Sequence, residues 1–270
     1  QGDIKPLEGE RDQNFRVTAS DGKRFVLKIS SAGEEPEVVD FQIRALEYLR
    51  SNAPEINVPQ VQRTGNGELT GALTSAAGVK HMVRMLSYVE GVPLSTIAAP
   101  SLTVARNAGI FQAGVAQSLA NFEHPAEDHY LVWNMSNGLI EDPALWKFGK
   151  QDIRAFEGRL RPHFAGHVIP ALRELRSQVI HSDGHQDNLL VAEGQPDEIA
   201  GLIDFGDMVR APLVCDAAIM ALGFAGDAQD PVKLSAAAIA GFNEVYPLTR
   251  VECDLLYDGM VMREALSVYC

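Results

Sequence analysis

The stretch from Val179 to Asp207 constrains the fold most strongly, because it combines two spaced polar patterns with two short apolar runs. The pattern H-x-D-x-x-x-x-N is filled by His181, Asp183 and Asn188, and the pattern D-F-G begins at Asp204. The runs LLV and IAGLI lie between the patterns, and the polar turn EGQPD that joins them predicts a β-hairpin. A hairpin returns the chain to its starting point, so Asn188 and Asp204 should lie side by side.

Asp183 precedes Asn188 on the same loop, so three oxygen-bearing side chains are expected to converge at one end of the hairpin. Oxygen ligands suit Mg²⁺, which binds few protein groups and completes its shell with phosphates and water. We therefore predict Asn188 and Asp204 as metal ligands and Asp183 as the base that accepts a hydroxyl proton during phosphoryl transfer. Either pattern alone would be weak, but their order and spacing together support this chemistry. His181 is interpreted as structural, orienting the loop by hydrogen bonding.

The segments HSDGHQDNLLV, IDFGD, FVLKIS and RMLSYVEGVPL resemble the aminoglycoside phosphotransferase-like kinases, which share a choline- and protein-kinase-like fold. LEGERDQNFRV and IDFGDMVRAPLVCDAAI are most similar to the hydroxylysine kinase branch, whose members also occur fused to aminotransferases. The resemblance implies an α+β bilobal fold, with an antiparallel sheet plus a helix in the N-terminal lobe. It also implies a mainly helical C-terminal lobe that carries the catalytic hairpin. The expected boundaries are 1–86 for the first lobe, 87–91 for the hinge and 92–270 for the second lobe.

Three elements of the N-terminal lobe carry the nucleotide residues that the resemblance implies. Lys28, in the second strand of a hairpin with Asp-Gly as its turn, would hold the α- and β-phosphates of ATP or GTP. The loop GERDQNF would cover the phosphates through backbone contacts near Gln13 and Asn14. In the hinge, the backbone of Ser87 and Val89 would read the edge of the base.

A helix predicted from Pro36 to Ser51 raises an open question about Lys28. Related kinases place a glutamate on this helix to pair with the strand lysine, whereas this chain has Gln42 at the expected position. Gln42 would hold Lys28 by a neutral hydrogen bond, or Asp40 or Glu37 would serve instead.

Further helices are expected from Val104 onward, over 151–177, over 215–222 and over 231–245, where apolar or alanine-rich faces recur at helical spacing. Trp133 is interpreted as a packing anchor. Both chain ends are expected to be truncated, because the chain begins without Met and stops within a helix-like pattern.

The amino-acid composition indicates which classes of molecule the protein can bind and in which cellular compartment it is expected. The net charge of −13 over 270 residues offers no basic patch for a nucleic acid. The three cysteines lack paired or metal-like spacing, which indicates a reducing cytoplasm. The longest apolar stretch is too short to cross a bilayer, so no membrane association is expected.

The sequence therefore predicts a small-molecule kinase that uses Mg²⁺ and a nucleoside triphosphate to phosphorylate a hydroxylated amine, with a fused or partner aminotransferase implied by the resemblance. Acidic residues near the expected cleft would attract an ammonium group, and two arginines are available for an α-carboxylate. These residues are Glu127, Asp128, Asp207, Asp216, Arg210 and Arg263. Two alternatives stay open: an aminoglycoside phosphotransferase, and a non-catalytic nucleotide-binding regulatory domain.

Overall fold

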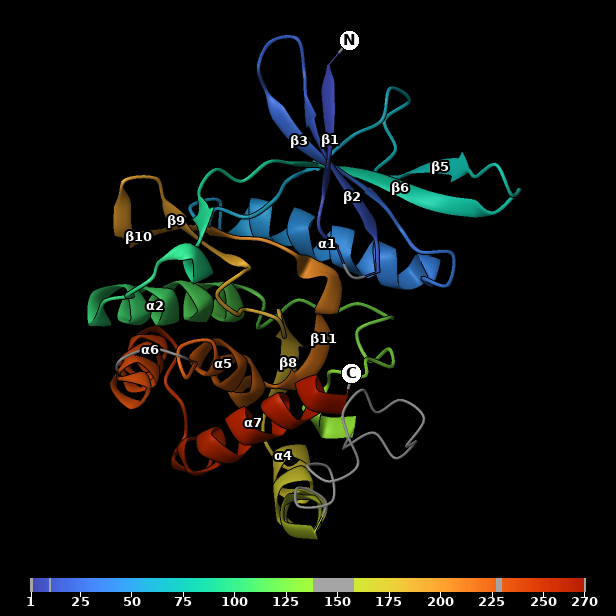
Figure 1. The fold of residues 1–270 in the computed structure, drawn as a ribbon. Coiled ribbons are helices and arrows are strands. Elements are labelled where there is room, and N and C mark those ends of the chain that lie inside the picture. The colour runs from blue at the N-terminus through green and yellow to red at the C-terminus, as the bar shows by residue number, and fades with distance from the viewer. Residues whose placement is uncertain (1, 10, 138–157, 227–229, 270) are drawn as a thin grey trace. The chain divides into compact units, whose positions relative to one another are not determined.

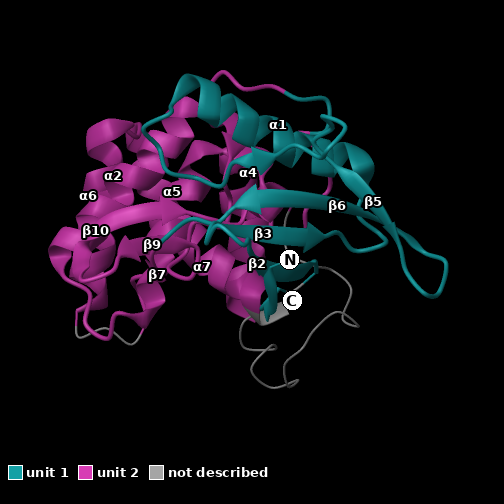
Figure 2. Ribbon diagram, turned by 90° about the horizontal axis from the view of Figure 1, so that it is seen from above, with its two compact units in different colours: residues 1–90, 124–126 teal, residues 91–123, 127–270 magenta. Residues whose placement is uncertain are grey.

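The computed structural model describes residues 2–9, 11–137, 158–226 and 230–269. The chain divides into two compact units, coloured separately in Figure 2. Unit 1 comprises residues 1–90 and 124–126, and unit 2 comprises residues 91–123 and 127–270. The division after Glu90 falls inside the stretch 87–91, where the sequence predicts the hinge.

Unit 1 is built on one antiparallel sheet whose strands follow the order β1-β2-β3-β6-β4, with β5 also paired to β6. The predicted hairpin is confirmed as β2 paired with β3. The strands of this six-stranded sheet are β1 (Asp3–Leu7), β2 (Gln13–Thr18), β3 (Arg24–Ile29), β4 (Val61–Gln62), β5 (Gly71–Thr74) and β6 (Lys80–Ser87).

The single long helix described in unit 1, α1 (Pro36–Asn52), lies beside this sheet and contacts β4 (Figure 1). A proline in its first turn fits the start of a helix, where the missing N–H has no partner to lose. Its buried face supplies much of the core of the unit. That face comprises Val38, Val39, Phe41, Ile43, Ala45, Leu46 and Leu49, together with the polar Gln42.

Unit 2 is mainly helical in the part of the chain that the structure describes. Its helices are α2 (Leu102–Ser118), α4 (Ile169–Arg173), α5 (Leu213–Leu222), α6 (Pro231–Val245) and α7 (Arg250–Tyr269), with a π-helical segment at Phe164–Val168. Helices α2 and α6 cross closely through two glycines. A Cβ on Gly109 would lie 1.9 Å from the carbonyl oxygen of Ala238, and one on Gly241 would lie 2.0 Å from that of Arg106.

Two small sheets of unit 2 frame the loop that carries the catalytic pattern. β8 (Ser177–Ile180) pairs with β11 (Val209–Pro212), and β9 (Leu189–Ala192) pairs with β10 (Gln195–Leu202) and with β7 (Val92–Pro93). The predicted hairpin is therefore confirmed as β9 and β10. Its turn is shorter than predicted, because Gly194 at φ +77° lets the chain reverse before Gln195.

The helix predicted over 151–177 ends earlier in the structure than the sequence predicts. Its first residues, 151–157, lie outside the described residues, and the described part ends at Arg173. Ser177 instead begins β8, since its partner Pro212 on β11 continues the two-stranded sheet. The helices predicted at 215–222 and 231–245 are confirmed as α5 and α6.

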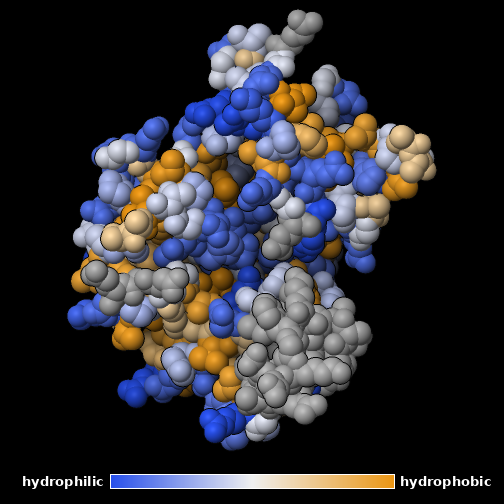
Figure 3. Space-filling model, in the orientation of Figure 1, coloured by the Kyte–Doolittle hydropathy of each residue, from blue (hydrophilic) through white to orange (hydrophobic). Residues whose placement is uncertain are grey.

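The surface is of mixed polarity, and Figure 3 shows hydrophilic and hydrophobic residues interspersed on one face. Within the described ranges, every helix is either too short or too polar to cross a membrane.

Candidate active site

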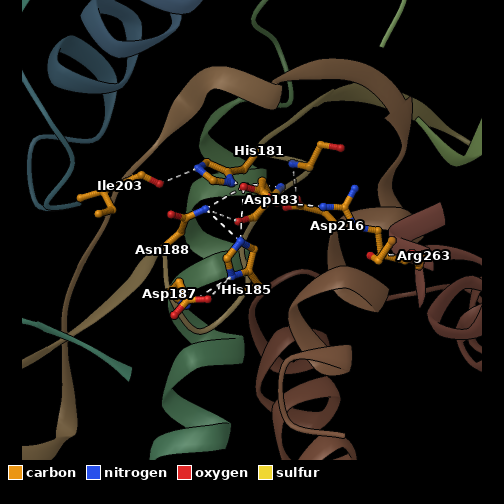
Figure 4. A network of polar contacts seen from close by, with 10 residues as sticks. His181, Asp183, His185, Asp187, Asn188, Ile203, Asp216 and Arg263 are labelled. Carbon is orange, nitrogen blue, oxygen red and sulfur yellow. Dashed lines mark hydrogen bonds and ion pairs between the residues drawn. The ribbon is translucent and has the colours of Figure 1, made fainter. Parts of the chain in front are cut away.

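The loop between β8 and β9 carries the catalytic pattern, and the hairpin that follows closes it (Figure 4). The N–H of Ile203 donates to the carbonyl oxygen of Asn188 at 2.9 Å. This bond brings Asn188 next to the residue that precedes Asp204, which is the juxtaposition that the sequence predicts for a hairpin.

The Asp183 carboxylate is held at both of its oxygens. Arg263 Nη2 donates to Oδ1 at 2.9 Å, and Asn188 Nδ2 donates to Oδ2 at 2.7 Å. Asn188 Nδ2 also donates to the backbone oxygen of Asp183 at 2.9 Å, which ties the two ends of the loop together. An ionised carboxylate has about four lone-pair sites, so Asp183 retains acceptor capacity for a hydroxyl proton.

His181 is completely buried beneath the loop and bonded at both ring nitrogens. Its Nδ1 accepts from the N–H of Asp183 at 3.3 Å, its Nε2 lies 3.1 Å from the carbonyl oxygen of Ile203, and its ring meets Phe205 edge-on at 4.6 Å. Burial lowers the pKa of His181 to about 4, although Asp183 and Asp204 act in the opposite direction. The neutral ring therefore donates from Nε2 and positions the loop, in line with the structural interpretation.

A buried carboxylate on α5 supports the same loop. Asp216 accepts from the N–H of Ser182 at 3.0 Å and from Gln112 Nε2 at 2.8 Å, and burial raises its pKa to about 6. Ser182 has φ 63°, a left-handed conformation that a non-glycine residue adopts only when its surroundings enforce it. The prediction that Asp216 attracts a substrate ammonium is therefore wrong, because its side chain is fully buried and holds the loop backbone.

His185 adds an ionisable neighbour to Asp183 that the sequence patterns do not predict. Its Nε2 lies 3.5 Å from Asp183 Oδ2, and its Nδ1 lies 3.4 Å from Asp187 Oδ2. Burial alone would lower the pKa of His185, but the bond to Asp183 and the charges of Asp183 and Asp187 raise it. The signal in the sequence was its position two residues after Asp183, within the same short loop.

Asn188 and Asp204 are the residues predicted to bind Mg²⁺, and their oxygen atoms are of the kind that this metal prefers. Because Asn188 Nδ2 donates to Asp183, the amide oxygen Oδ1 remains the oxygen that a metal can use. Asp204 ends the hairpin with φ 59°, another left-handed non-glycine residue at a predicted site position. The described residues contain no group of three or more His, Cys, Asp or Glu suited to a metal. An amide oxygen and a carboxylate match a metal that takes its remaining ligands from phosphates.

In unit 1, Lys28 lies on β3 directly opposite Arg84 on β6, and both side chains are buried. Asp12, just ahead of β2, approaches both of them through Oδ2, which lies 3.9 Å from Lys28 Nζ and 3.1 Å from Arg84 Nη2. One carboxylate is thus shared by two cations. No periodic pattern surrounds Asp12 in the sequence, so this partner could not be identified from the sequence alone.

Gln42 lies in the same cluster, but its side-chain oxygen accepts from Arg84 Nη2 at 2.9 Å. Arg84 Nη1 also donates to Ser30 Oγ at 2.8 Å. Of the alternatives proposed for pairing with Lys28, Asp40 forms an ion pair with Arg44 at 3.2 Å on the surface of α1. The structure therefore indicates Asp12 as a carboxylate partner of Lys28, and this residue was absent from the sequence-based candidates.

The other predicted nucleotide residues have defined local roles in unit 1. Asn14 Nδ2 donates to the carbonyl oxygen of Glu8 at 3.3 Å, which stabilises the connection between β1 and β2. The N–H of Ser87 donates to the carbonyl oxygen of Gln60 at 2.8 Å, and Val89 is buried. Nucleotide binding by Asn14, Ser87 and Val89 stays a prediction.

The two arginines considered for a substrate carboxylate differ in their partners. Arg210 Nε donates to Glu127 Oε1 at 2.7 Å, and its Nη1 donates to the carbonyl oxygen of Ser177 at 3.1 Å. Arg210 and Glu127 therefore neutralise each other. The guanidinium of Arg263 instead lies over the ring of Trp133, 4.5 Å from its centroid, so Trp133 packs against a cation next to Asp183.

Comparison with known proteins agrees with this geometry. Mouse hydroxylysine kinase (Mus musculus) is 28% identical over 275 residues, covering 94% of this chain and 73% of that protein. The solved structure of a microcompartment-associated aminopropanol kinase superposes with a TM-score of 0.80 at 18% identity, covering 99% of this chain and 83% of that one. Amicoumacin kinase in complex with AMP-PNP, Ca²⁺ and Ami gives a TM-score of 0.75 at 15% identity, covering 98% and 79%.

These structural likenesses confirm the kinase-like fold that the sequence predicts. A family model described as the phosphotransferase enzyme family, APH, matches residues 3–250. The chain therefore belongs to the APH phosphotransferase family.

Proposed function

We propose that this phosphotransferase transfers the γ-phosphate of ATP or GTP to a hydroxyl group of an amino acid or amino alcohol such as hydroxylysine. The observation that carries the proposal is the anchoring of Asp183 at both oxygens by Arg263 and Asn188. Such anchoring fixes the direction of a carboxylate that must meet one hydroxyl, and positioning is the main contribution of a protein to phosphoryl transfer.

Asp183 acts as the base in this proposal. It accepts the proton of the attacking hydroxyl while the oxygen–phosphorus bond forms and the bond to the departing nucleoside diphosphate breaks. The neutral His181 and the buried Asp216 keep the loop backbone in place, since each bonds a backbone N–H within it.

Asn188 and Asp204 would hold Mg²⁺, which supplies charge neutralisation for the phosphates. Lys28 would bind the nucleotide phosphates, with Asp12 keeping its ammonium group in place. Amicoumacin kinase, whose fold this chain shares, was solved with AMP-PNP and Ca²⁺, an adenine nucleotide analogue and a divalent cation.

The acceptor class follows from relatives that are named for their substrates. Hydroxylysine and aminopropanol each combine a hydroxyl group with an amine. The cytoplasmic location and the aminotransferase partner implied by the family resemblance stay predictions.

The proposal is tested by incubating the protein with Mg-ATP or Mg-GTP and a panel of hydroxylated amino acids, amino alcohols and aminoglycosides. Mass spectrometry then detects the phosphorylated product. We expect a phosphate ester on a small hydroxylated amine, formed only with metal present and lost in Asp183→Asn. Faster turnover of kanamycin-like compounds would replace this acceptor class with aminoglycosides, and no transfer to any acceptor would favour a non-catalytic nucleotide-binding domain.

A further inference from the structure

Arg263 lies on α7 and is a buried cation that uses only part of its hydrogen-bonding capacity within the described residues. Its side chain is 9% exposed, its Nη2 donates to Asp183, and its guanidinium stacks on Trp133. Its Nη1 is buried and has no hydrogen-bond partner among the residues that the structure describes. A guanidinium is a planar fork of donors, so Nη1 points toward an acceptor site beside the one that Asp183 fills.

A second donor without an acceptor lies on a neighbouring segment. The short 3-10 turn Met135–Asn137 follows Trp133 in the chain and contacts α7. Within it, Ser136 Oγ is also buried and has no hydrogen-bond partner in the described part of the chain. Buried donors normally have acceptors, so two such groups on adjoining elements indicate that a group rich in oxygen belongs there.

We infer that Arg263 binds the α-carboxylate of the acceptor, and that the acceptor is therefore a hydroxylated amino acid rather than a simple amino alcohol. This inference rests on the proposed kinase function of the site. Arginine matches a carboxylate through charge-assisted hydrogen bonds and a fixed fork geometry. Its two Nη atoms then bind two carboxylates, Asp183 through Nη2 and the substrate through Nη1.

The shared guanidinium also sets where the reacting hydroxyl lies. Asp183 must contact that hydroxyl, and Arg263 contacts both Asp183 and the substrate carboxylate, so the distance between the two ends of the substrate is fixed. An amino alcohol that lacks the carboxylate leaves Nη1 unsatisfied. A site built to hydrogen-bond a group discriminates against the analogue that lacks it.

Arg210, the other arginine considered, does not have this property, because Glu127 already accepts from it at 2.7 Å. It is therefore a matched control: a part-buried arginine of the same unit that is bonded to a carboxylate. Arg263 is treated as a specificity-determining residue, and its effect must be separated from the mere positioning of Asp183.

The test compares 5-hydroxylysine with its decarboxylated counterpart, which has the same hydroxyl and amines. For the wild-type protein we expect kcat/KM to favour the amino acid by roughly 10- to 100-fold, as one charge-assisted contact provides. Arg263→Gln and Arg263→Lys should lose most of this preference, mainly through a higher KM for the amino acid. Arg210→Gln should retain it.

Calorimetric binding of the same two compounds gives a readout that does not depend on turnover. Equal falls in kcat for both compounds in Arg263→Gln, with the preference intact, would show that Arg263 only positions Asp183. Wild-type protein that binds and phosphorylates both compounds equally would also overturn the inference while leaving the kinase function standing. If the wild type phosphorylates neither compound nor any other acceptor, the proposed function fails, and a binding preference for the amino acid that Arg263→Gln abolishes still supports the carboxylate contact.

Discussion

Two largely buried polar clusters, one in each unit, are assembled from different kinds of chain segment. The Asp183 cluster comprises His181, Asp183, Asn188, Asp216 and Arg263. The Lys28 cluster comprises Asp12, Lys28, Ser30, Gln42 and Arg84. The first is a continuous loop supported by helices, whereas the second joins two strands, α1 and residues next to the strand ends.

In the Asp183 cluster, most supports other than His181 come from regular elements or lie next to one. The hairpin β9–β10 fixes Asn188, α5 provides Asp216, and α7 provides Arg263. The left-handed conformations of Ser182 and Asp204 persist because these contacts over-determine the loop. This arrangement is suited to holding a reacting group in one direction.

In the Lys28 cluster, strand register alone places Lys28 opposite Arg84. The carboxylate that they share, Asp12, precedes β2 and lies 3.9 Å from Lys28 but 3.1 Å from Arg84. This arrangement concentrates positive charge, which suits a phosphate chain. We therefore expect a change of Asp183 to alter the rate of transfer, and a change of Asp12 to alter nucleotide affinity.

The largest effect is expected from Asp204→Ala, which removes a predicted metal ligand. Turnover should fall by roughly 10⁴-fold, because a metal contributes several kcal/mol of charge stabilisation to the transition state. Affinity for the Mg²⁺-nucleotide complex should weaken as well, and Asn188→Ala should act more mildly because the lost group is neutral. Titration of labelled nucleotide with and without Mg²⁺ measures both effects. Unchanged metal-dependent affinity in Asp204→Ala would remove this residue from the metal site.

A smaller effect, on stability, is expected from Asp216→Asn. The pKa of Asp216 rises from 3.8 to about 6 on folding, so its contribution to stability is present below pH 3.8 and is lost as pH rises to about 6. For such a shift in pKa, the free energy of unfolding falls by on the order of 3 kcal/mol over this pH range. Gln112 Oε1 has no hydrogen-bond partner within the described ranges, so a reorientation of this amide lets it accept from the new asparagine.

Urea unfolding of wild type and Asp216→Asn at pH 4 and pH 7 measures this contribution. The wild type should lose stability relative to the variant as pH rises. The exposed Asp254→Asn serves as the control, with changes within about 0.5 kcal/mol. A wild-type advantage that grows with pH would contradict the buried-carboxylate account.

The two clusters also differ in how far the sequence predicts them. The Asp183 cluster can be predicted from the sequence because its main residues lie on one loop closed by a hairpin. Hairpin geometry brings Asn188 to the residue before Asp204. Helical and strand periodicity predicted α1, α5, α6 and the β2–β3 hairpin for the same reason, since local spacing determines these elements.

What the sequence could not predict depends on contacts between distant segments. Arg84 and Asp12 are 72 residues apart and meet only through the order of strands in the sheet. Asp216 and Ser182 are 34 residues apart, and the depth of burial that changes the role of Asp216 follows from helix packing. The family resemblance and the helix pattern together point to Gln42 as the lysine partner, and neither carries information about a loop residue such as Asp12.

The smallest effect is expected from Gln42→Glu. Asp12 already provides a carboxylate for Lys28 and Arg84, so a new glutamate beside Arg84 should compete with it and weaken nucleotide affinity by less than about tenfold. Turnover at saturating nucleotide should change little. Gln195→Glu, at an exposed position, is the charge-matched control. A large gain in turnover would instead show that Gln42 leaves the native site handicapped.

The most direct measurement compares Asp183→Asn with Asp12→Asn for two quantities, the Kd of the Mg²⁺-nucleotide complex and the single-turnover rate of phosphoryl transfer. Asp183→Asn should lower the rate by about 10²- to 10⁴-fold and leave Kd within about threefold of wild type. Asp12→Asn should weaken Kd by about tenfold and leave the rate at saturating nucleotide almost unchanged. Equal losses of rate in both variants, or a nucleotide affinity that depends on Asp183 as strongly as on Asp12, would contradict the division of work between the two clusters.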